Sequence, residues 1–312
     1  MPAKLRWDAS RDYVGTLVAD AHLKHTADRW GGSITAALFL IVDGLRIVYD
    51  DSGAGDPLLL LHGYPQNRRA WRHQQAALAG DRRVIAPDWV GWGESERQTD
   101  VSVQFDVEVA RVTGFLDALG LAQVDVAGHD YGGLLALGFV RRYPQRVARL
   151  AILNSRAHRT FPGVYYWVVA LVGALARNRV LRWLLWCAPL YWIHRLGLAR
   201  FVRQGCFDAE LVESYVGFLR GPGRRWWMRL FADYQLGART ELAAALGEIH
   251  CRTLIMWGSA DTWCPIAIAD ALAAAIPNAD LVRVEGADHF VMEQRPAEVS
   301  EALARFFEPR PR

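Results

Sequence analysis

An aspartate flanked by small residues is the position in this sequence best suited to chemistry. Asp130 is the centre of the pentapeptide GHDYG, which follows the apolar run 124–127 and precedes an apolar stretch typical of a helix. Side chains at Gly128 and Gly132 would collide in a sharp turn from strand to helix, so glycine suits both positions. Such a turn directs the N–H groups of the helix toward its tip, where they favour negative charge. An ionised carboxylate held there can act as a nucleophile.

An acid and a histidine follow two later apolar runs. Asp261 comes after the run 253–256, and His289 comes after the run 281–284. Strand ends of a parallel sheet meet at one edge, so we expect both side chains near Asp130. The chain order nucleophile, acid, histidine is that of a hydrolytic triad. Asp288 is the weaker candidate for the acid, because the neighbour of a histidine usually points elsewhere.

A glycine loop supplies a candidate oxyanion hole. The stretch HGYP follows the apolar run 58–61 and contains Tyr64. Its glycine permits a close approach of the backbone, so the N–H of Tyr64 can lie beside that of Tyr131. Two such donors would stabilise negative charge on a reacting carboxyl group.

Short apolar runs alternate with helical patterns from residue 38 onward. Because most runs are apolar on both faces, the alternation predicts a mostly parallel, doubly wound α/β sheet covered by helices. Asp43-Gly44 suits a tight hairpin turn between the first two strands. The predicted strands are 38–42, 45–49, 58–61, 84–86, 124–127, 150–153, 253–256 and 281–284, and the predicted helices are 68–79, 103–119, 132–142, 265–275 and 296–307.

The alternation stops between residues 156 and 245, which predicts an inserted helical cap over the site. Residues 38–155 and 246–312 then form the two parts of the core, and 1–37 form an N-terminal extension. The apolar run 163–176 is too short to span a bilayer. We interpret it as the apolar lining of the cap, with a membrane-surface patch as the alternative. The cap is rich in tryptophan: Trp167, Trp183, Trp186, Trp192, Trp226 and Trp227.

Composition excludes several classes of protein. The 312 residues carry a net charge of +3 without a continuous basic stripe, so we expect no nucleic-acid partner. The four cysteines lack ligand-like spacing, which argues against a metal site and disulfides. The N-terminal residues contain no signal-like apolar run, so we predict a cytoplasmic protein without a transmembrane segment. The sequence leaves the oligomeric state open, a homodimer included.

Five stretches, HGYPQN, APDWVGWGES, GHDYGG, GSADTW and ADHF, resemble the α/β-hydrolase superfamily over about residues 38–308. The resemblance is to its aspartate-nucleophile branch, which holds epoxide hydrolases and the haloalkane and haloacetate dehalogenases. It implies that Asp130 attacks an sp³ carbon to form an alkyl ester. His289 would then activate water against the ester, Asp261 would orient His289, and the amides of Tyr64 and Tyr131 would form the oxyanion hole. It implies neither cofactor nor metal.

One position supports Asp261 as the acid. Asn154 follows the run 150–153, where some dehalogenases place the acid, and an amide cannot serve as one. The arrangement with Asp261 is shared with epoxide hydrolases. His62 and Asp88 match family positions that shape loops, and we interpret both as structural.

The groups that stabilise the leaving group distinguish the three activities. Haloalkane dehalogenases usually have Trp where Tyr131 stands and often Asn where Tyr64 stands. Haloacetate dehalogenases bind the substrate carboxylate with arginines just after the nucleophile, a stretch that here holds Tyr131 and Leu134. Epoxide hydrolases polarise the ring oxygen with two cap tyrosines, which Tyr166 and Tyr234 match best.

We therefore predict an epoxide hydrolase that acts on a small apolar epoxide with water. A dehalogenase with the same Asp-His-Asp triad is the alternative, in which Trp167 and one tyrosine would contact the halide. A non-catalytic ligand-binding protein of the same fold is a third hypothesis. The complete set of Asp130, Asp261 and His289 argues against it, because a receptor needs no triad.

Overall fold

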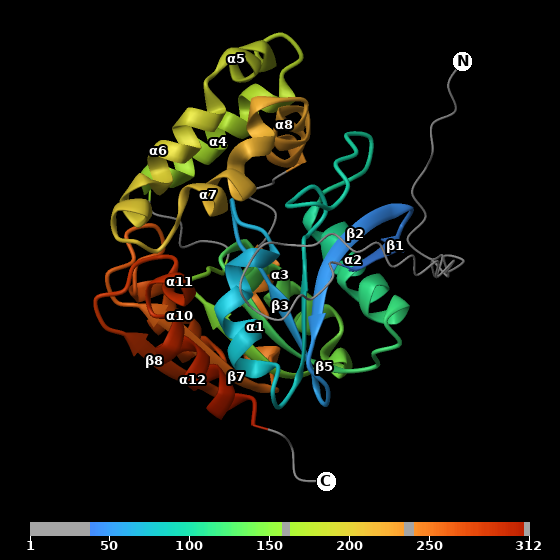
Figure 1. The fold of residues 1–312 in the computed structure, drawn as a ribbon, viewed down its shortest axis with the longest axis vertical. Helices are drawn as coiled ribbons and strands as arrows, with labels where there is room; N and C mark the ends of the chain where they lie inside the picture. The colour runs from blue at the N-terminus through green and yellow to red at the C-terminus, as the bar shows by residue number, and fades with distance from the viewer. Residues whose placement is uncertain (1–37, 158–162, 234–239, 309–312) are drawn as a thin grey trace.

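Eight strands form one sheet with the order β1-β2-β4-β3-β5-β6-β7-β8 (Figure 1). The computed structural model describes residues 38–157, 163–233 and 240–308, so the predicted N-terminal extension lies outside it. All eight predicted strands are present. They are β1 (Leu38–Val42), β2 (Leu45–Ser52), β3 (Pro57–Leu61), β4 (Arg83–Pro87), β5 (Val124–His129), β6 (Val147–Leu153), β7 (Arg252–Gly258) and β8 (Ala279–Val284).

The sheet is parallel from β4 to β8, and β1 and β2 form an antiparallel hairpin at one edge. Asp43 and Gly44 make the hairpin turn with φ angles of 52° and 74°, as the Asp-Gly pair predicts. In the central strands Leu61 pairs with Gly128, and Leu153 pairs with both His129 and Met256. The carboxyl ends of β3, β5, β6 and β7 are therefore level, and the loops that follow them lie together.

Helices cover both faces of the sheet, and the alternation of side chains along the strands explains why. In β3, Leu59 and Leu61 point into one core cluster, while Leu58 and Leu60 point into the other. Helices α2 (Phe105–Ala118), α3 (Tyr131–Arg142) and α10 (Ala267–Ala275) pack on the first face. Helices α1 (Arg72–Leu78), α11 (Val291–Gln294) and α12 (Pro296–Phe306) pack on the second.

The remaining helices lie between β6 and β7 in the chain. Figure 1 shows α4 to α8 gathered beyond one end of the sheet. These helices belong to residues 156–245, for which a cap over the site was predicted. They have a hydrophobic cluster of their own, which includes Phe201, Phe207 and Trp227. These helices are α4 (Gly163–Arg177), α5 (Arg182–Cys187), α6 (Leu190–Arg203), α7 (Ala209–Val216), α8 (Gly223–Asp233) and α9 (Thr240–Ala244). Within the described residues, no helix is both long and apolar enough to cross a membrane.

Candidate active site

Asp130 occupies a strained turn between β5 and α3. Its φ of 46° and ψ of −113° lie outside the regions that non-glycine residues prefer, which costs about 1–3 kcal/mol. Three hydrogen bonds hold this backbone. The N–H of Asp130 donates to the carbonyl of Leu153 at 3.2 Å, and its carbonyl accepts from the Ser155 hydroxyl at 2.5 Å and the Leu134 N–H at 3.1 Å. The turn is thus fixed by its neighbours in β6 and α3.

Glycines make room for this turn. A Cβ atom on Gly128 would lie 2.4 Å from the carbonyl oxygen of Gly132, and one on Gly132 would lie 2.1 Å from that of Leu61. A Cβ atom on Gly63 would lie 2.6 Å from the Cβ of Asp130. Backbone atoms cannot move aside as a flexible side chain can, so larger residues at the first two positions would displace the elbow.

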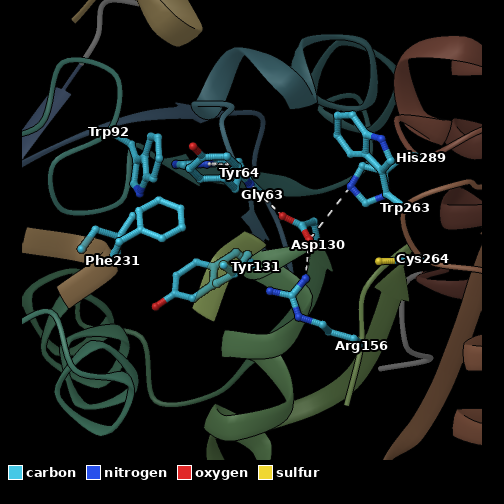
Figure 2. Close-up of a pocket in the computed structure, with 13 residues that line it drawn as sticks. Gly63, Tyr64, Trp92, Asp130, Tyr131, Arg156, Phe231, Trp263, Cys264 and His289 are labelled. Atoms are coloured by element: carbon cyan, nitrogen blue, oxygen red, sulfur yellow. Dashed lines mark hydrogen bonds and ion pairs between the residues drawn. The ribbon is translucent and has the colours of Figure 1, made fainter. Parts of the chain in front are cut away.

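The two carboxylate oxygens of Asp130 have different surroundings (Figure 2). Oδ2 accepts a hydrogen bond from the N–H of Tyr64 at 2.9 Å. Oδ1 lies 3.2 Å from a guanidinium nitrogen of Arg156 and 4.0 Å from Nε2 of His289. Tyr131, the second predicted backbone donor, is the first residue of α3. One oxygen is therefore held by the backbone, while the other faces ionisable side chains.

His289 is oriented by Asp261. Its Nδ1–H donates to Oδ2 of Asp261 at 3.0 Å, which leaves Nε2 toward Asp130. The N–H groups of Trp263 and Cys264 donate to Oδ1 of Asp261 at 2.7 and 2.8 Å. The structure thus brings Asp130, Asp261 and His289 together, as their positions after strand ends predict.

Asn154 holds the carboxylate of Asp261 in position, a role that the sequence did not indicate. Its side-chain N–H donates to Oδ2 of Asp261 at 2.7 Å, and its side-chain oxygen accepts from the Gly258 N–H at 3.2 Å. The residue has a φ of 38°, which asparagine tolerates better than most side chains. The side-chain amide of Asn154 cannot act as the acid of the triad, but it positions the acid, Asp261.

Asp288 binds other groups. Its Oδ1 accepts from the N–H groups of Thr262 at 3.2 Å and His289 at 2.8 Å, and its Oδ2 pairs with Arg200 at 2.9 Å. These contacts tie the loop after β8 to the loop after β7 and to α6. Between the two candidate acids, Asp261 is the one whose carboxylate contacts the imidazole of His289.

The charges around His289 stabilise its protonated form. Burial alone would lower the pKa of His289, but the carboxylate of Asp261 and its hydrogen bond raise the pKa well above the usual value. Burial likewise opposes ionisation of Asp261, yet His289 and the hydrogen bond from Asn154 hold its pKa below the ordinary value. The charged forms of the two groups therefore stabilise each other.

A second buried histidine supports the backbone of the first. Nε2–H of His129 donates to the carbonyl of His289 at 2.9 Å, and the two ring centroids are 5.0 Å apart. Burial and the nearby His289 lower the pKa of His129 to about 3, so it is neutral. His129 belongs to the GHDYG motif, and its contact places it as a support of the His289 loop.

A cavity of about 240 Å³ opens beside Asp130. Its volume lies below the ~300–1,000 Å³ typical of sites for drug-sized ligands, so it suits a small molecule. Most of its surface is aromatic or aliphatic, with the charged side chains gathered at one side (Figure 2). The lining residues are His62, Gly63, Tyr64, Trp92, Asp130, Tyr131, Arg156, Val169, Leu230, Phe231, Trp263, Cys264 and His289.

Tyr64 joins the cavity to the cap. Its hydroxyl accepts from Nε1–H of Trp227 at 2.8 Å and donates to Nε2 of His194. The direction of the second bond follows from Nδ1 of His194, which donates to the carbonyl of Leu190 at 2.7 Å. Burial lowers the pKa of His194, which keeps it neutral and able to accept. The Tyr64 hydroxyl therefore already accepts one hydrogen bond and donates its only proton to another.

The predicted cap contacts have different outcomes. Trp167 belongs to α4, but its side chain is 71% exposed and is not among the residues that line the cavity. Val169 is the α4 residue that does line it. Tyr166 also belongs to α4, but its side chain lies outside the described residues, as does all of Tyr234.

Arg156 is a charged site residue that the sequence-based prediction did not include. It follows Asn154 and Ser155 beyond the end of β6, and only 12% of its side chain is exposed. The arginines expected of a haloacetate dehalogenase just after the nucleophile are replaced here by Tyr131 and Leu134. The signal was an arginine after a neighbouring strand end, where a parallel sheet presents its ligand-binding groups.

Three residues could in principle ligate a metal. Asp261, Cys264 and His289 each place a potential ligand atom within 4.8 Å of the others. Both oxygens of Asp261 already accept hydrogen bonds, and Nδ1 of His289 donates one. A metal would have to displace the contacts that orient His289, so this donor set fits a hydrogen-bonded acid–base pair better.

Comparison with known proteins identifies the family. Residues 58–302 match the family described as "Alpha/beta hydrolase family". The chain belongs to this family. The predicted α/β-hydrolase fold, with its mostly parallel sheet between layers of helices, is confirmed.

Relatives within the alpha/beta hydrolase family have several activities. The 2-hydroxymuconate semialdehyde hydrolase of Pseudomonas sp. (strain CF600) is 32% identical over 249 residues, which cover 78% of this chain and 83% of the relative. Haloalkane dehalogenase 2 of Mycobacterium tuberculosis is 29% identical over 84% of this chain and 91% of the relative. The solved structure of epoxide hydrolase CorEH has a TM-score of 0.72 and 28% identity, covering 87% of this chain and 98% of that one. Family membership therefore shows that the chain is a hydrolase. It does not specify the reaction, which has to be inferred from the residues of the site.

Proposed function

We propose that this hydrolase opens a small epoxide to a diol through an ester on Asp130. The observation that carries the proposal is that the two carboxylate oxygens of Asp130 have different contacts. Oδ2 rests on the N–H of Tyr64 at 2.9 Å, while Oδ1 faces Nε2 of His289 at 4.0 Å. A carboxylate held in this way presents one oxygen for attack and keeps the other on a donor that can stabilise negative charge.

The first step forms the ester. Oδ1 of Asp130 attacks a ring carbon, the carbon–oxygen bond of the epoxide breaks, and the leaving oxygen takes a proton. An alkoxide is strongly basic, so this step needs a proton donor, and a phenol hydroxyl can serve. We assign this role to Tyr166 and Tyr234 on the strength of the cap sequence. The hydroxyl of Tyr64 is a poor substitute, because it already donates to His194.

The second step hydrolyses the ester. His289 takes a proton from water, the water oxygen attacks the carbonyl carbon, and negative charge collects on Oδ2 beside the N–H of Tyr64. The bond between that carbon and Oδ1 then breaks, and the product alkoxide takes the proton from His289. The carboxylic acid formed on Asp130 returns its proton to the phenolate left by the first step. The 4.0 Å separation of Nε2 and Oδ1 exceeds a direct hydrogen bond and suits a water placed between base and ester.

Two further observations support this reaction. The cavity is small and mostly apolar, as a small apolar epoxide requires. The solved structure of epoxide hydrolase CorEH covers 87% of this chain. Attack of Asp130 on a carbonyl carbon would instead give a reactive anhydride. The activity named for the 2-hydroxymuconate semialdehyde hydrolase therefore fits this nucleophile less well.

Arg156 favours a second candidate, a haloacid dehalogenase. Its guanidinium lies 3.2 Å from Oδ1 of Asp130, on the oxygen that attacks. A substrate carboxylate bonded to the reacting carbon would give this cation a new partner as Oδ1 forms its bond, because guanidinium binds carboxylates well. The likeness to haloalkane dehalogenase 2 supports halide displacement by the same carboxylate.

One panel tests these alternatives. Purified protein is incubated with styrene-oxide-type epoxides, haloalkanes, haloacetates and 2-hydroxymuconate semialdehyde, and diol, halide and cleavage products are measured. We expect diol from epoxides. One turnover in ¹⁸O water should place label in the carboxylate of Asp130, because hydrolysis breaks the acyl side of the ester.

Other results would replace the proposal. Halide release without epoxide opening, abolished by Arg156→Met for haloacetates alone, would establish the second candidate. Label found only in the product of the first turnover would show direct attack by water. No turnover of any class would favour the non-catalytic binding hypothesis.

A further inference from the structure

The cap presents an unusual concentration of apolar side chains to solvent. Of the thirteen large hydrophobic side chains that are exposed in the described part of the chain, twelve lie between residues 167 and 202. They include Leu196 at 77%, Val180 at 72% and Trp192 at 64% exposure. We call these twelve the cap surface: Trp167, Val168, Leu171, Val180, Leu181, Trp183, Leu184, Trp186, Trp192, Ile193, Leu196 and Val202.

The cap surface belongs to three helices and the turn between two of them. It takes residues from α4, from the link 178–181, from α5 and from α6. On α6, Trp192, Ile193 and Leu196 are spaced so that they share one side of the helix. Figure 1 shows α4, α5 and α6 beyond the end of the sheet, with α5 remote from every strand. The cap surface therefore lies on helices beyond the end of the sheet.

The same segment carries basic residues and no acidic ones. No aspartate or glutamate occurs from residue 131 to residue 207. Five arginines of α4 to α6 and their link are exposed, and none of them forms an ion pair with a carboxylate of the described residues. They are Arg177, Arg179, Arg182, Arg195 and Arg203. The apolar side chains are thus interspersed with uncompensated positive charge.

We propose that the cap surface binds an anionic lipid bilayer. Helices that lie in a membrane interface combine tryptophan and aliphatic side chains with arginine or lysine. The apolar groups enter the boundary of the acyl chains, while the guanidinium groups remain among the phosphates. None of the helices of the cap surface needs to cross the membrane to bind in this way.

The charge pattern argues against a second copy of the chain as the occupant. A self-complementary interface would bring the arginines of two cap surfaces together without acidic partners, and like charges at an interface cost several kcal/mol. A bilayer that contains acidic headgroups supplies the missing negative charge. The inference does not depend on which substrate the cavity accepts.

Vesicle flotation tests the proposal with the full-length protein. We expect it to float with vesicles of phosphatidylcholine containing about 30% phosphatidylserine and to remain largely unbound with pure phosphatidylcholine. Raising the salt concentration should weaken binding, because it screens the charges. Failure to float with the anionic vesicles at low salt would overturn the proposal.

A triple variant, Trp183→Ser/Trp192→Ser/Leu196→Ser, tests the apolar contribution. All three side chains are exposed, so the variant should keep its circular dichroism spectrum and its hydrolysis of a water-soluble substrate. We expect it to lose flotation, whereas Ile41→Ser, the matched control in β1 at 41% exposure, should float like the wild type. If wild type and triple variant float equally, the cap surface is not the binding face.

A charge variant gives an independent measure. Arg179→Gln/Arg182→Gln should weaken binding to the anionic vesicles about 25-fold, since each basic residue near such a surface contributes roughly fivefold. Arg305→Gln, on α12 of the core, should change it little. Analytical ultracentrifugation of the protein without vesicles gives a further test. A dimer that the triple variant abolishes would overturn the proposal, because the cap surface would then be a subunit interface.

Discussion

The carboxyl-terminal edge of the sheet, where the active-site loops follow the strand ends, and the cap are held by different kinds of contact. At the edge, backbone N–H groups position the carboxylates: that of Tyr64 holds Asp130, and those of Trp263 and Cys264 hold Asp261. In the cap, aromatic rings pack against one another. The ring of Trp227, for example, lies tilted against that of Phe231 with centroids 4.5 Å apart.

This difference separates chemistry from substrate choice. Substituting a carboxylate at the edge leaves the backbone that held it in place, so the fold should survive while the reaction stops. Substituting a cap side chain alters the walls of the cavity, where Val169, Leu230 and Phe231 come from α4 and α8. Edge variants should therefore affect the rate by large factors, and cap variants by smaller ones.

The largest effect is expected at the histidine. His289→Gln removes the base that activates water, and the analogous loss in a serine triad costs on the order of 10⁶-fold in rate. Attack by Asp130 does not require this base, so the ester should accumulate and appear in the intact mass of the protein. Asp130→Asn serves as the control, in which no adduct should form. An unmodified His289→Gln protein after incubation with a verified substrate would contradict the assigned role.

The next effect concerns the acid. Asp261→Asn should slow ester hydrolysis by about 10⁴-fold, as the corresponding change does in a serine triad. Because Asp261 raises the pKa of His289, the rise of the hydrolysis rate with pH should also move to lower pH in this variant. Asp288→Asn is the matched control, since its carboxylate binds Thr262 and Arg200. Near-normal hydrolysis by Asp261→Asn, with loss in Asp288→Asn, would reverse the assignment.

The edge could be predicted from sequence because strand ends fix it. Asp130, Asp261 and His289 each follow a short apolar run, and the level ends of parallel strands bring such residues together. Asn154 also follows a strand, but its positioning role depends on a backbone with a φ of 38°. No pattern of residue types reports that angle.

The cap resisted prediction for a different reason. The run GVYYWVVALVGALA in α4 is apolar on every side, so its helical period does not indicate which face meets the cavity. Tertiary packing decides this, and it turns Val169 inward and Trp167 outward. Arg156 follows the end of β6, so the strand-end pattern applies to it, but its residue type alone does not show that its guanidinium turns toward Asp130.

Cap tyrosines should produce the third effect in size. Tyr166→Phe and Tyr234→Phe should each slow formation of the Asp130 ester from an epoxide about 10²-fold, because each removes a proton donor. Hydrolysis of the ester, measured in single turnovers, should remain unchanged. Trp167→Phe is the control and should have little effect, since its side chain is 71% exposed. If Trp167→Phe is the most damaging cap change in a halide-releasing enzyme, the dehalogenase reaction replaces our proposal.

The smallest effect is expected where core and cap meet, at Glu293 of α11. Its carboxylate accepts from the hydroxyl of Tyr215 in α7 at 3.0 Å and pairs with Arg72 at 2.6 Å. Burial raises the pKa of Glu293 from 4.5 to about 7, although Arg72 opposes the shift. The protonated form is thus favoured by folding, and its contribution to stability is complete below about pH 4.5 and disappears as pH rises through 7.

The Glu293→Gln variant isolates this contribution. Between about pH 5.5 and 7, the free energy of unfolding of the wild type should fall by about 1.5 kcal/mol relative to the variant, because only the wild type gains a buried charge. Urea unfolding at both pH values measures the difference, and other titrating groups cancel because both proteins share them. Glu301→Gln, on the exposed side of α12, should track the wild type. A difference of opposite sign would mean that Arg72 keeps Glu293 ionised, and core and cap would then be joined by an ion pair rather than by a neutral carboxyl group.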